Sequence, residues 1–294
     1  MDSSTLPVEA ALPERRGRSA LRRFFRHPTG VLGLAIVAFL IVISLLAPVL
    51  KPYDARADRN LRARLAAPSA EFVFGADELG RDIFTRVLHG GRISLRAGLI
   101  AVAFAAIVGT FLGVLAGFLG GWVDIAVVWT VDLLLAFPGI LLAIAIVATL
   151  GPNLTNALIA IAITQVPIYT RIMRSAVMQV KESEYVQAAR AVGLKSPRIV
   201  LRHVLPNSLA PLIVQLTLSI GTAILDVAAL GFLGLGAQPP SPEWGLMIRD
   251  GFSQFLRAPW MSIFPGLGIF LAVVGFNLLG DAVRDVLDPR LRNA

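Results

Sequence analysis

Five stretches without a charged residue are each long enough to cross a lipid bilayer, and this pattern constrains the fold more than any other feature of the chain. They lie at residues 28–50, 97–123, 133–170, 203–225 and 258–280. A transmembrane helix needs about 20 predominantly apolar residues. Of the 294 residues, 56% are hydrophobic and only 16% are charged, whereas about a quarter of a soluble domain is charged. The composition therefore argues against a soluble, disordered or fibrous chain and favours a membrane protein.

The stretch 133–170 is too long for one helix and contains the turn signal Gly-Pro-Asn at 151–153. The helix before this turn must begin near residues 124–126 to reach a full span, which carries Asp132 into the membrane. The first stretch is too long for a signal peptide and lacks a clear small-residue cleavage site, so we interpret it as an uncleaved helix. The sequence predicts an all-α polytopic membrane protein with six transmembrane helices, at roughly 29–50, 95–119, 125–150, 154–178, 208–235 and 260–281.

The charge distribution predicts the orientation. Lys and Arg number 27 against 19 Asp and Glu, a formal net charge of +8 that could indicate a nucleic-acid partner or basic cytoplasmic loops. The basic residues gather in 1–27 and in and just before 182–207, and six helices place both segments on the same side as the C-terminus. The positive-inside rule therefore predicts an N-in, C-in topology. Residues 51–93, with eight basic and six acidic residues, do not follow this bias.

These observations divide the chain into consecutive parts. Cysteine is absent, so no disulfide framework is expected. The predicted parts are a cytoplasmic basic N-terminal segment (1–27), a first transmembrane helix (28–50), an extracytoplasmic loop (51–93), a five-helix core transmembrane domain (94–281) that contains a cytoplasmic loop at 182–207, and a cytoplasmic C-terminal tail (282–294).

Four glycines repeat at every fourth position of the second predicted helix. Small residues at this spacing lie on one helix face and let two helix backbones approach closely, which is how many helices pack in lipid. The pattern predicts helix packing, within a compact bundle or in a dimer, for Gly109, Gly113, Gly117 and Gly121.

Polar side chains within the spans are candidates for a translocation pathway. A charged residue in a membrane costs about 2.5–3.5 kcal/mol on insertion scales, so it should face protein or a watery cavity. The alternative for each is a hydrogen bond to a neighbouring helix, which we favour for Asp132. Proline at 138 and at 167 predicts kinks in the third and fourth helices. The candidates are Asp226, Gln165, Asp132 and Asn277.

The cytoplasmic loop reads as two short helices. Ser183 is a candidate N-cap for the first, which is predicted to end at Gly193. The second begins with Ser196 as N-cap and Pro197 and is predicted to end by Pro206. The first helix groups four residues on one apolar face: Tyr185, Ala188, Ala189 and Val192. A DNA-binding helix-turn-helix has a similar outline, but the second helix is very short and the motif lies between two membrane spans.

The same loop resembles the EAA motif of ABC importer permeases, EAA-x3-G-x9-I-x-LP. Gln187 stands where the motif has Glu, and His203 stands where it has Ile. In that family the loop is a coupling helix that docks into the nucleotide-binding subunit. The resemblance implies a coupling role for Glu184, Tyr185, Gln187, Ala188, Ala189, Arg190, Gly193, Leu205 and Pro206.

Further stretches resemble the "C" permeases of the dipeptide/oligopeptide importer group, which have a MetI-like transmembrane domain. They are FGADELGRDIFTRVLHGGRISL (74–95), NSLAPLIVQ (207–215), ILDVAALGFLGLGAQPPSPEWGLMI (224–248) and FNLLGDAVRDVLDPRLR (276–292). The resemblance implies an ABC type I importer permease fold in a bacterial inner membrane. It also implies a heterodimer with a homologous "B" permease, two ABC ATPases that bind ATP and Mg, and an extracytoplasmic peptide-binding protein that docks on 51–93 and 236–260.

The chain shows no catalytic or metal motif of its own. No Lys follows a Gly, so the phosphate-binding loop G-x4-G-K-[ST] is absent, and His27, His89 and His203 are far apart in the sequence. We therefore expect a non-enzymatic subunit with no cofactor in this chain. The alternatives are a glutathione or nickel permease of the same group and, from another class, an ion-coupled secondary transporter or channel. Internal inverted repeats would favour the latter, and none is apparent.

Overall fold

In the computed structural model, which describes residues 22–54 and 58–287, the regular elements are all helices. The long helices are α2 (Pro28–Leu50), α3 (Ile83–Leu119), α4 (Gly121–Leu135), α5 (Gly139–Leu150), α6 (Leu154–Lys181), α9 (Leu205–Phe232) and α11 (Trp260–Leu287). The short ones are η1 (Leu61–Ala63), α7 (Glu184–Ala191), α8 (Ser196–Ile199), the π-helical turn η2 (Val200–Val204) and α10 (Trp244–Phe252).

Within the described residues, five continuous helices are long and apolar enough to cross a membrane: α2, α3, α6, α11 and the run from Ser196 to Phe232. The pair α4–α5 also passes this test as a unit, bent by 90° at its break. The break lies at Pro138, where the sequence predicts a kink, because proline cannot continue the hydrogen-bond ladder. The predicted all-α membrane fold is confirmed, with five continuous candidate spans and a sixth where the bent pair α4–α5 crosses as one span.

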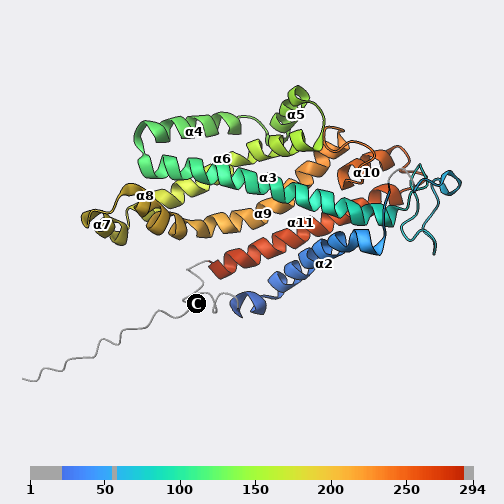
Figure 1. The fold of residues 1–294 in the computed structure, drawn as a ribbon, viewed down its shortest axis with the longest axis horizontal. Helices are drawn as coiled ribbons and strands as arrows, with labels where there is room; N and C mark the ends of the chain where they lie inside the picture. The colour runs from blue at the N-terminus through green and yellow to red at the C-terminus, as the bar shows by residue number, and fades with distance from the viewer. Residues whose placement is uncertain (1–21, 55–57, 288–294) are drawn as a thin grey trace, which may run out of the picture.

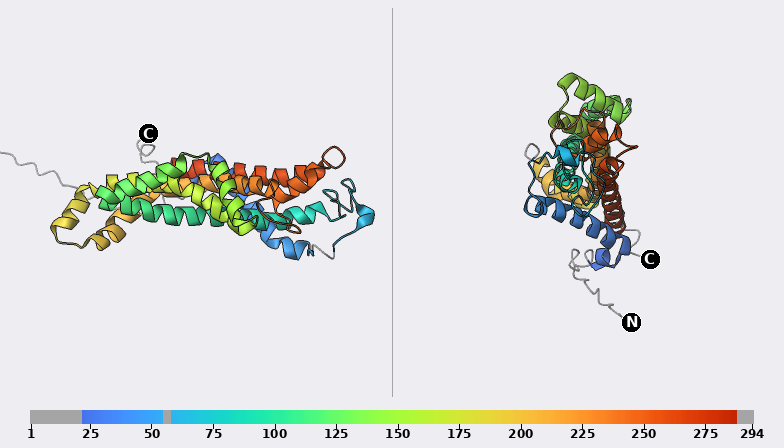
Figure 2. Two further views of the ribbon diagram at one scale, coloured as in Figure 1. Left: turned by 90° about the horizontal axis from the view of Figure 1, so that it is seen from above. Right: turned by 90° about the vertical axis from the view of Figure 1, so that its right-hand side faces the viewer.

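The helices form an elongated bundle (Figure 1). The short helices α7 and α8 lie at one end, here called the α7 end, and α10 and residues 58–82 lie at the other, the α10 end. The bundle seen end-on has α4–α5 on one side and α2 on the opposite side (Figure 2). Helix α2 begins, and helix α11 ends, on the side of the bundle that faces the α7 end. Orientation in the membrane stays a prediction.

Helix α3 begins much earlier than the sequence predicts, at Ile83 instead of near residue 95. The Asp82 carboxylate caps it, accepting hydrogen bonds from the backbone N–H groups of Phe84 at 3.2 Å and Thr85 at 3.3 Å. The last part of the predicted loop 51–93 is therefore helical. A hydropathy scan misses these turns because they carry Arg86 and Arg92.

The predicted end of the second loop helix at Pro206 is wrong. Helix α8 continues through η2 into α9 without a break, and Pro206 lies in the first turn of α9. The N–H of Leu205 donates to Val200 O, a five-residue step that widens the helix just before the proline. Proline has no N–H to donate to the helical ladder, and the widened turn lies directly before it. The N-cap of α8 is Lys195 and not Ser196.

The core of the bundle is a close seam between α3 and α6. A Cβ built on Gly109 would lie 2.5 Å from Tyr169 Cβ, and one on Gly113 would lie 2.7 Å from Met173 Cβ. One on Gly117 would lie 2.8 Å from the carbonyl oxygen of Arg174. Side chains are excluded at these three positions, so the backbones meet within one chain. Gly121 takes no part in this seam, because it begins α4 and a Cβ there would touch nothing in the described part of the chain, and its role in a dimer stays a prediction.

Candidate functional site

The two ends of helix α7 are formed by Ser183 and Gly193. Ser183 is its N-cap residue, as predicted, but its hydroxyl donates to Val180 O at 2.6 Å and makes no capping bond. After the C-terminal end of α7, Gly193 adopts φ +79°. Glycine takes this left-handed conformation without steric penalty, so the turn between α7 and α8 depends on it.

One face of α7 packs against the bundle and another is free. Val186 is fully buried and Ala189 nearly so, in an apolar cluster with Met173 and Val177 of α6. This corrects the predicted face, because Ala189 belongs to the packed side. The exposed apolar residues on and directly after α7 include Tyr185, Ala188 and Val192, and Val192 is 78% exposed.

The other predicted coupling residues lie at the same end in different environments. Glu184 is exposed, and Gln187 is exposed and donates from Nε2 to Glu182 O at 3.1 Å. The Arg190 guanidinium lies 5.8 Å from the centre of the Phe118 ring, within range of a cation–π contact. Leu205 packs against the cluster below α7, and Pro206 is exposed at the start of α9. Their coupling role stays a prediction.

Two of the four predicted pathway residues share a pocket. Asp226 of α9 and Gln165 of α6 line a cavity of about 370 Å³ that is closed on its third side by α5. Further polar residues of this pocket are Thr164, Gln215, Ser219 and Thr222. The Gln165 Oε1 atom is buried and has no hydrogen-bond partner in the described part of the chain. The pocket thus offers a carboxyl group and amide groups within otherwise apolar helices.

The other two pathway candidates lie elsewhere. Asp132 is about half exposed on α4 and forms an ion pair of 2.5 Å with Arg171 of α6. Asn277 of α11 packs against α9, with its Oδ1 3.6 Å from the Cβ position of Gly221. The structure does not bring Asp132 or Asn277 to the pocket of Asp226 and Gln165, and Asp132 has the ion-paired role that the sequence favours.

A second ion pair joins the same two helices and was missed from the sequence. Asp124 of α4 pairs with Arg174 of α6, with Nη2 2.6 Å from Oδ2. The signal for it was present, because Asp124 and Asp132 lie two turns apart on one face of α4, and Arg171 and Arg174 lie one turn apart on α6. These pairs attach α4, whose only buried residue is Val131.

At the α10 end, a buried carboxylate fixes the loop before α3 to the first turn of that helix. Asp77 Oδ2 lies 2.7 Å from Arg81 Nε and 2.6 Å from Arg86 Nη1, and all three side chains are less than 10% exposed. Asp77 Oδ1 accepts from the N–H groups of Leu79 and Arg81. Arg86 also approaches Asp250 of α10 at 3.9 Å. Every oxygen of Asp77 is satisfied, which makes this a fixed junction.

Glu243 is a fully buried carboxyl group that caps α10. It accepts hydrogen bonds from the N–H groups of Gly245 and Leu246, both at 2.8 Å, and from Ser94 Oγ at 3.1 Å. Burial raises the pKa of Glu243 above its ordinary value, and these three hydrogen bonds oppose the shift. The bond to Ser94 connects α10 to α3. A hydropathy scan places Glu243 in an external loop and does not indicate that it caps α10 or contacts α3.

Comparison with known proteins identifies the family. The model of the binding-protein-dependent transport system inner membrane component matches residues 109–293. The chain belongs to this family. Residues 16–68 match the N-terminal transmembrane domain of oligopeptide transport permease C. The chain is thus a multi-pass permease, as the EAA-like loop and the 74–95, 207–215, 224–248 and 276–292 stretches predict.

Relatives of this permease cover nearly the whole chain. The dipeptide transport system permease DppC of Alkalihalophilus pseudofirmus is 52% identical, over 94% of this chain and 90% of that protein. The di/tripeptide permease DppC of Pseudomonas aeruginosa is 47% identical over 94% of each. The glutathione permease GsiD of Pectobacterium atrosepticum is 44% identical over 99% of this chain and 97% of that protein.

The fold is also similar to that of a solved ABC transporter. A chain of the MetNI methionine ABC transporter in an inward-facing conformation superposes with a TM-score of 0.54 at 21% identity. The similarity covers 69% of this permease and 97% of that chain. The predicted fold, that of an ABC importer permease with a MetI-like transmembrane domain, is confirmed.

Proposed function

We propose that this permease transports dipeptides and short oligopeptides across a bacterial inner membrane, as one half of an ATP-driven pore. The sequence identity to two permeases named for dipeptide and di/tripeptide transport supports this substrate class. The observation that carries the coupling role is the uncovered apolar face of α7, formed by Tyr185, Ala188 and Val192 at the end of a rigid cluster.

The proposed assembly contains a homologous "B" permease, two ABC ATPase subunits and an extracytoplasmic peptide-binding protein. In this assembly the ATPases bind ATP and Mg, and this permease supplies no catalytic group. The face of α7 docks against an ATPase subunit, because an exposed apolar strip on a short helix is suited to a groove on a partner. The binding protein docks at the α10 end, on parts of 51–93 and 236–260.

The packing suggests how a movement of α7 would reach the pathway. Val186 and Ala189 rest on Met173 and Val177 of α6 and, through the same cluster, on Val204 of η2 and Leu205 of α9. Gln165 lies on α6 about two turns beyond Met173, roughly 12 Å at 1.5 Å per residue. Because α6 and α9 each carry both a coupling contact and a pathway residue, displacement of α7 as a unit shifts the walls of the Asp226 pocket.

The Asp226 pocket provides the first test. We predict that Asp226→Asn lowers ATP-dependent uptake of a labelled dipeptide by about tenfold in proteoliposomes that contain all subunits. Thr222→Val, at an exposed position of the same pocket, serves as the control for changed polarity alone. Assembly and basal ATP hydrolysis should be unchanged in both. Unaltered uptake by Asp226→Asn would remove this residue from the pathway.

The second candidate substrate is glutathione, which the identity to GsiD favours. Both candidates can be compared in the same proteoliposomes with the cognate binding protein. Uptake of labelled dipeptide that excess glutathione does not reduce supports the peptide assignment. Uptake of labelled glutathione, and not of dipeptide, would reassign the substrate, and uptake that follows an ion gradient without ATP would overturn the proposed energy source.

A further inference from the structure

Two arginines on α3 lack a counter-charge. Arg92 and Arg96 are one helical turn apart, and in the part of the chain that the structure describes neither has an ion-pair or hydrogen-bond partner. In contrast, Arg86 on the same helix and Arg171 and Arg174 on α6 each pair with a carboxylate. Like charges at this spacing repel each other, so the pair gains free energy from a bound anion.

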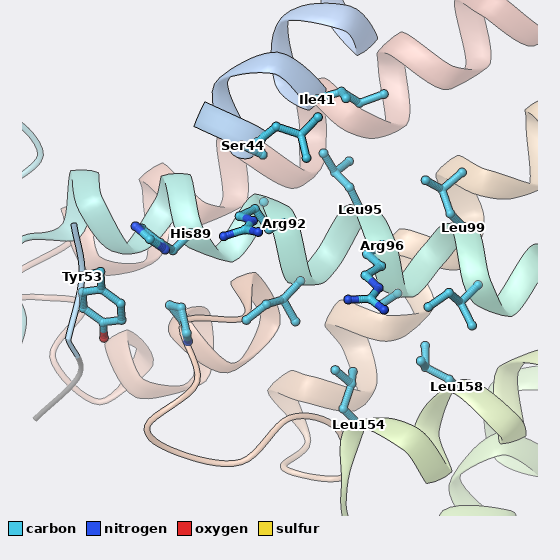
Figure 3. A pocket seen from close by; sticks show the side chains of 16 residues that line it. Ile41, Ser44, Tyr53, His89, Arg92, Leu95, Arg96, Leu99, Leu154 and Leu158 are labelled. Atoms are coloured by element: carbon cyan, nitrogen blue, oxygen red, sulfur yellow. The ribbon is translucent and has the colours of Figure 1, made fainter. Parts of the chain in front are cut away.

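Both guanidinium groups line a groove of about 720 Å³ between α2, α3 and the start of α6 (Figure 3). Its walls are otherwise largely apolar. Arg92 lies beside Ser44 and His89, while Arg96 points toward the start of α6 (Figure 3). The apolar wall residues are Ile41 and Leu45 of α2, Leu95, Leu99 and Ile100 of α3, and Leu154 and Leu158 of α6.

The groove also contains a neutral donor. Tyr53 lines the groove through its ring, and its buried hydroxyl has no hydrogen-bond partner among the described residues. The Ser44 hydroxyl reaches the same wall because Gly91 lets α2 approach α3, and a Cβ at Gly91 would lie only 2.2 Å from Ser44 Oγ. Two exposed cations and the Ser44 hydroxyl therefore line one open groove.

The depth of the groove matches the boundary between headgroups and acyl chains. Arg96 directly precedes the charge-free stretch 97–123, and Ser44 lies six residues before the end of α2, about 9 Å along the helix. Leu45, Leu99 and Ile100 are each more than 40% exposed on the outside of the groove. An occupant here meets cations at one end and apolar side chains at the other.

We propose that this groove binds an anionic phospholipid from the leaflet at the α10 end. The phosphate lies between the guanidinium groups of Arg92 and Arg96, with Ser44 as a neutral donor. One acyl chain lies along Leu45, Leu99 and Ile100. A zwitterionic phospholipid fits the apolar wall equally well but carries a cation that the two arginines repel. The arginine pair is therefore the source of the selectivity for an anionic headgroup.

The test uses the complete importer purified in mild detergent. Phosphatidylglycerol and phosphatidylcholine with the same acyl chains are titrated separately, and bound lipids are counted by native mass spectrometry. The proposal predicts one site per complex that prefers phosphatidylglycerol by about tenfold. Arg92→Gln with Arg96→Gln abolishes this preference, whereas Arg92→Lys with Arg96→Lys retains most of it.

Arg62→Gln with Arg64→Gln is the matched control, because it removes two exposed charges from the same end outside the groove. It should leave the preference unchanged. Subunit stoichiometry verifies that each variant assembles. A preference that survives Arg92→Gln with Arg96→Gln would overturn the proposal. Absence of the preference in the wild type would also overturn it and would assign the arginines to a carboxylate of a partner subunit. Displacement of the lipid by a dipeptide would overturn it as well and would assign the arginines to the transported peptide.

Discussion

The two ends of this permease are held by different kinds of interaction. At the α10 end, the carboxyl groups of Asp77 and Glu243 are buried, and each accepts at least three hydrogen bonds. At the α7 end, a short helix rests on apolar contacts through Val186 and Ala189. Its other apolar face, including Val192, is open.

This difference predicts that the two ends of the bundle differ in how easily they move. Charge-assisted hydrogen bonds are directional, so the α10 end resists distortion and loses much stability if one member is removed. Apolar packing on α7 involves few directional bonds, so the helix can move with α6 and α9 as one body. The α10 end is then a fixed frame and the α7 end a movable contact.

The largest effect is expected from removal of the Asp77 carboxylate. Asp77→Ala leaves Arg81 buried without a counter-charge and Arg86 with only the Asp250 carboxylate at 3.9 Å, and breaking a buried ion pair costs about 3–5 kcal/mol of folding free energy. Glu71→Ala, an exposed acidic residue of the same loop, is the control. Thermal unfolding of the purified complex should shift far more for Asp77→Ala, and equal shifts would contradict a fixed frame at this end.

A smaller loss is expected from Glu243→Ala, which leaves three donors unsatisfied and removes the cap of α10, at a cost of about 2 kcal/mol. Glu243→Gln keeps an acceptor and should cost less. Because burial raises the pKa of Glu243, its contribution to stability is full below about pH 4.5, the ordinary value, and decreases as the pH rises through the raised pKa. Unfolding measured across this pH range should show that decrease in the wild type but not in Glu243→Gln.

The seam that joins the two ends provides a third test. Gly113→Ala places a Cβ 2.7 Å from both Met173 Cβ and the carbonyl oxygen of Thr170, and overpacking of this kind costs about 1–3 kcal/mol. Gly266→Ala in α11 is a matched control, since a Cβ there meets nothing within 4 Å. We expect a lower unfolding midpoint for the first variant alone. An equal decrease of the unfolding midpoint in Gly266→Ala would mean that replacement of any helical glycine, and not overpacking of the seam, causes the loss.

Much of the fold follows from where charges are absent, because lipid excludes them. The same method fails where a helix extends into water: it misses the turns of α3 after Asp82, although the cap and Thr85 were visible in the sequence. Pro138 signals the break between α4 and α5, but the 90° angle depends on how α5 packs against α6.

The site was predictable in position but not in orientation. The spacing groups Tyr185, Ala188, Ala189 and Val192 on one side of a helix, whereas the structure turns Ala189 toward α6. Helical periodicity cannot distinguish these faces, since both are apolar and only the cluster with Met173 decides between them. Glu243 was missed for a different reason, because its partner Ser94 is distant in the sequence.

The central claim is that the open face of α7 transmits ATPase movement, and Val192→Glu tests it most directly. Val192 is 78% exposed, so a charge there should spare folding, whereas Ala189→Glu would disturb the packed face. The measurement is ATP hydrolysis stimulated by peptide-loaded binding protein in the reconstituted complex, with Gln179→Glu on the exposed surface of α6 as the control. We predict that Val192→Glu lowers this stimulation at least tenfold while the control retains it. Full stimulation in correctly assembled Val192→Glu would contradict the account.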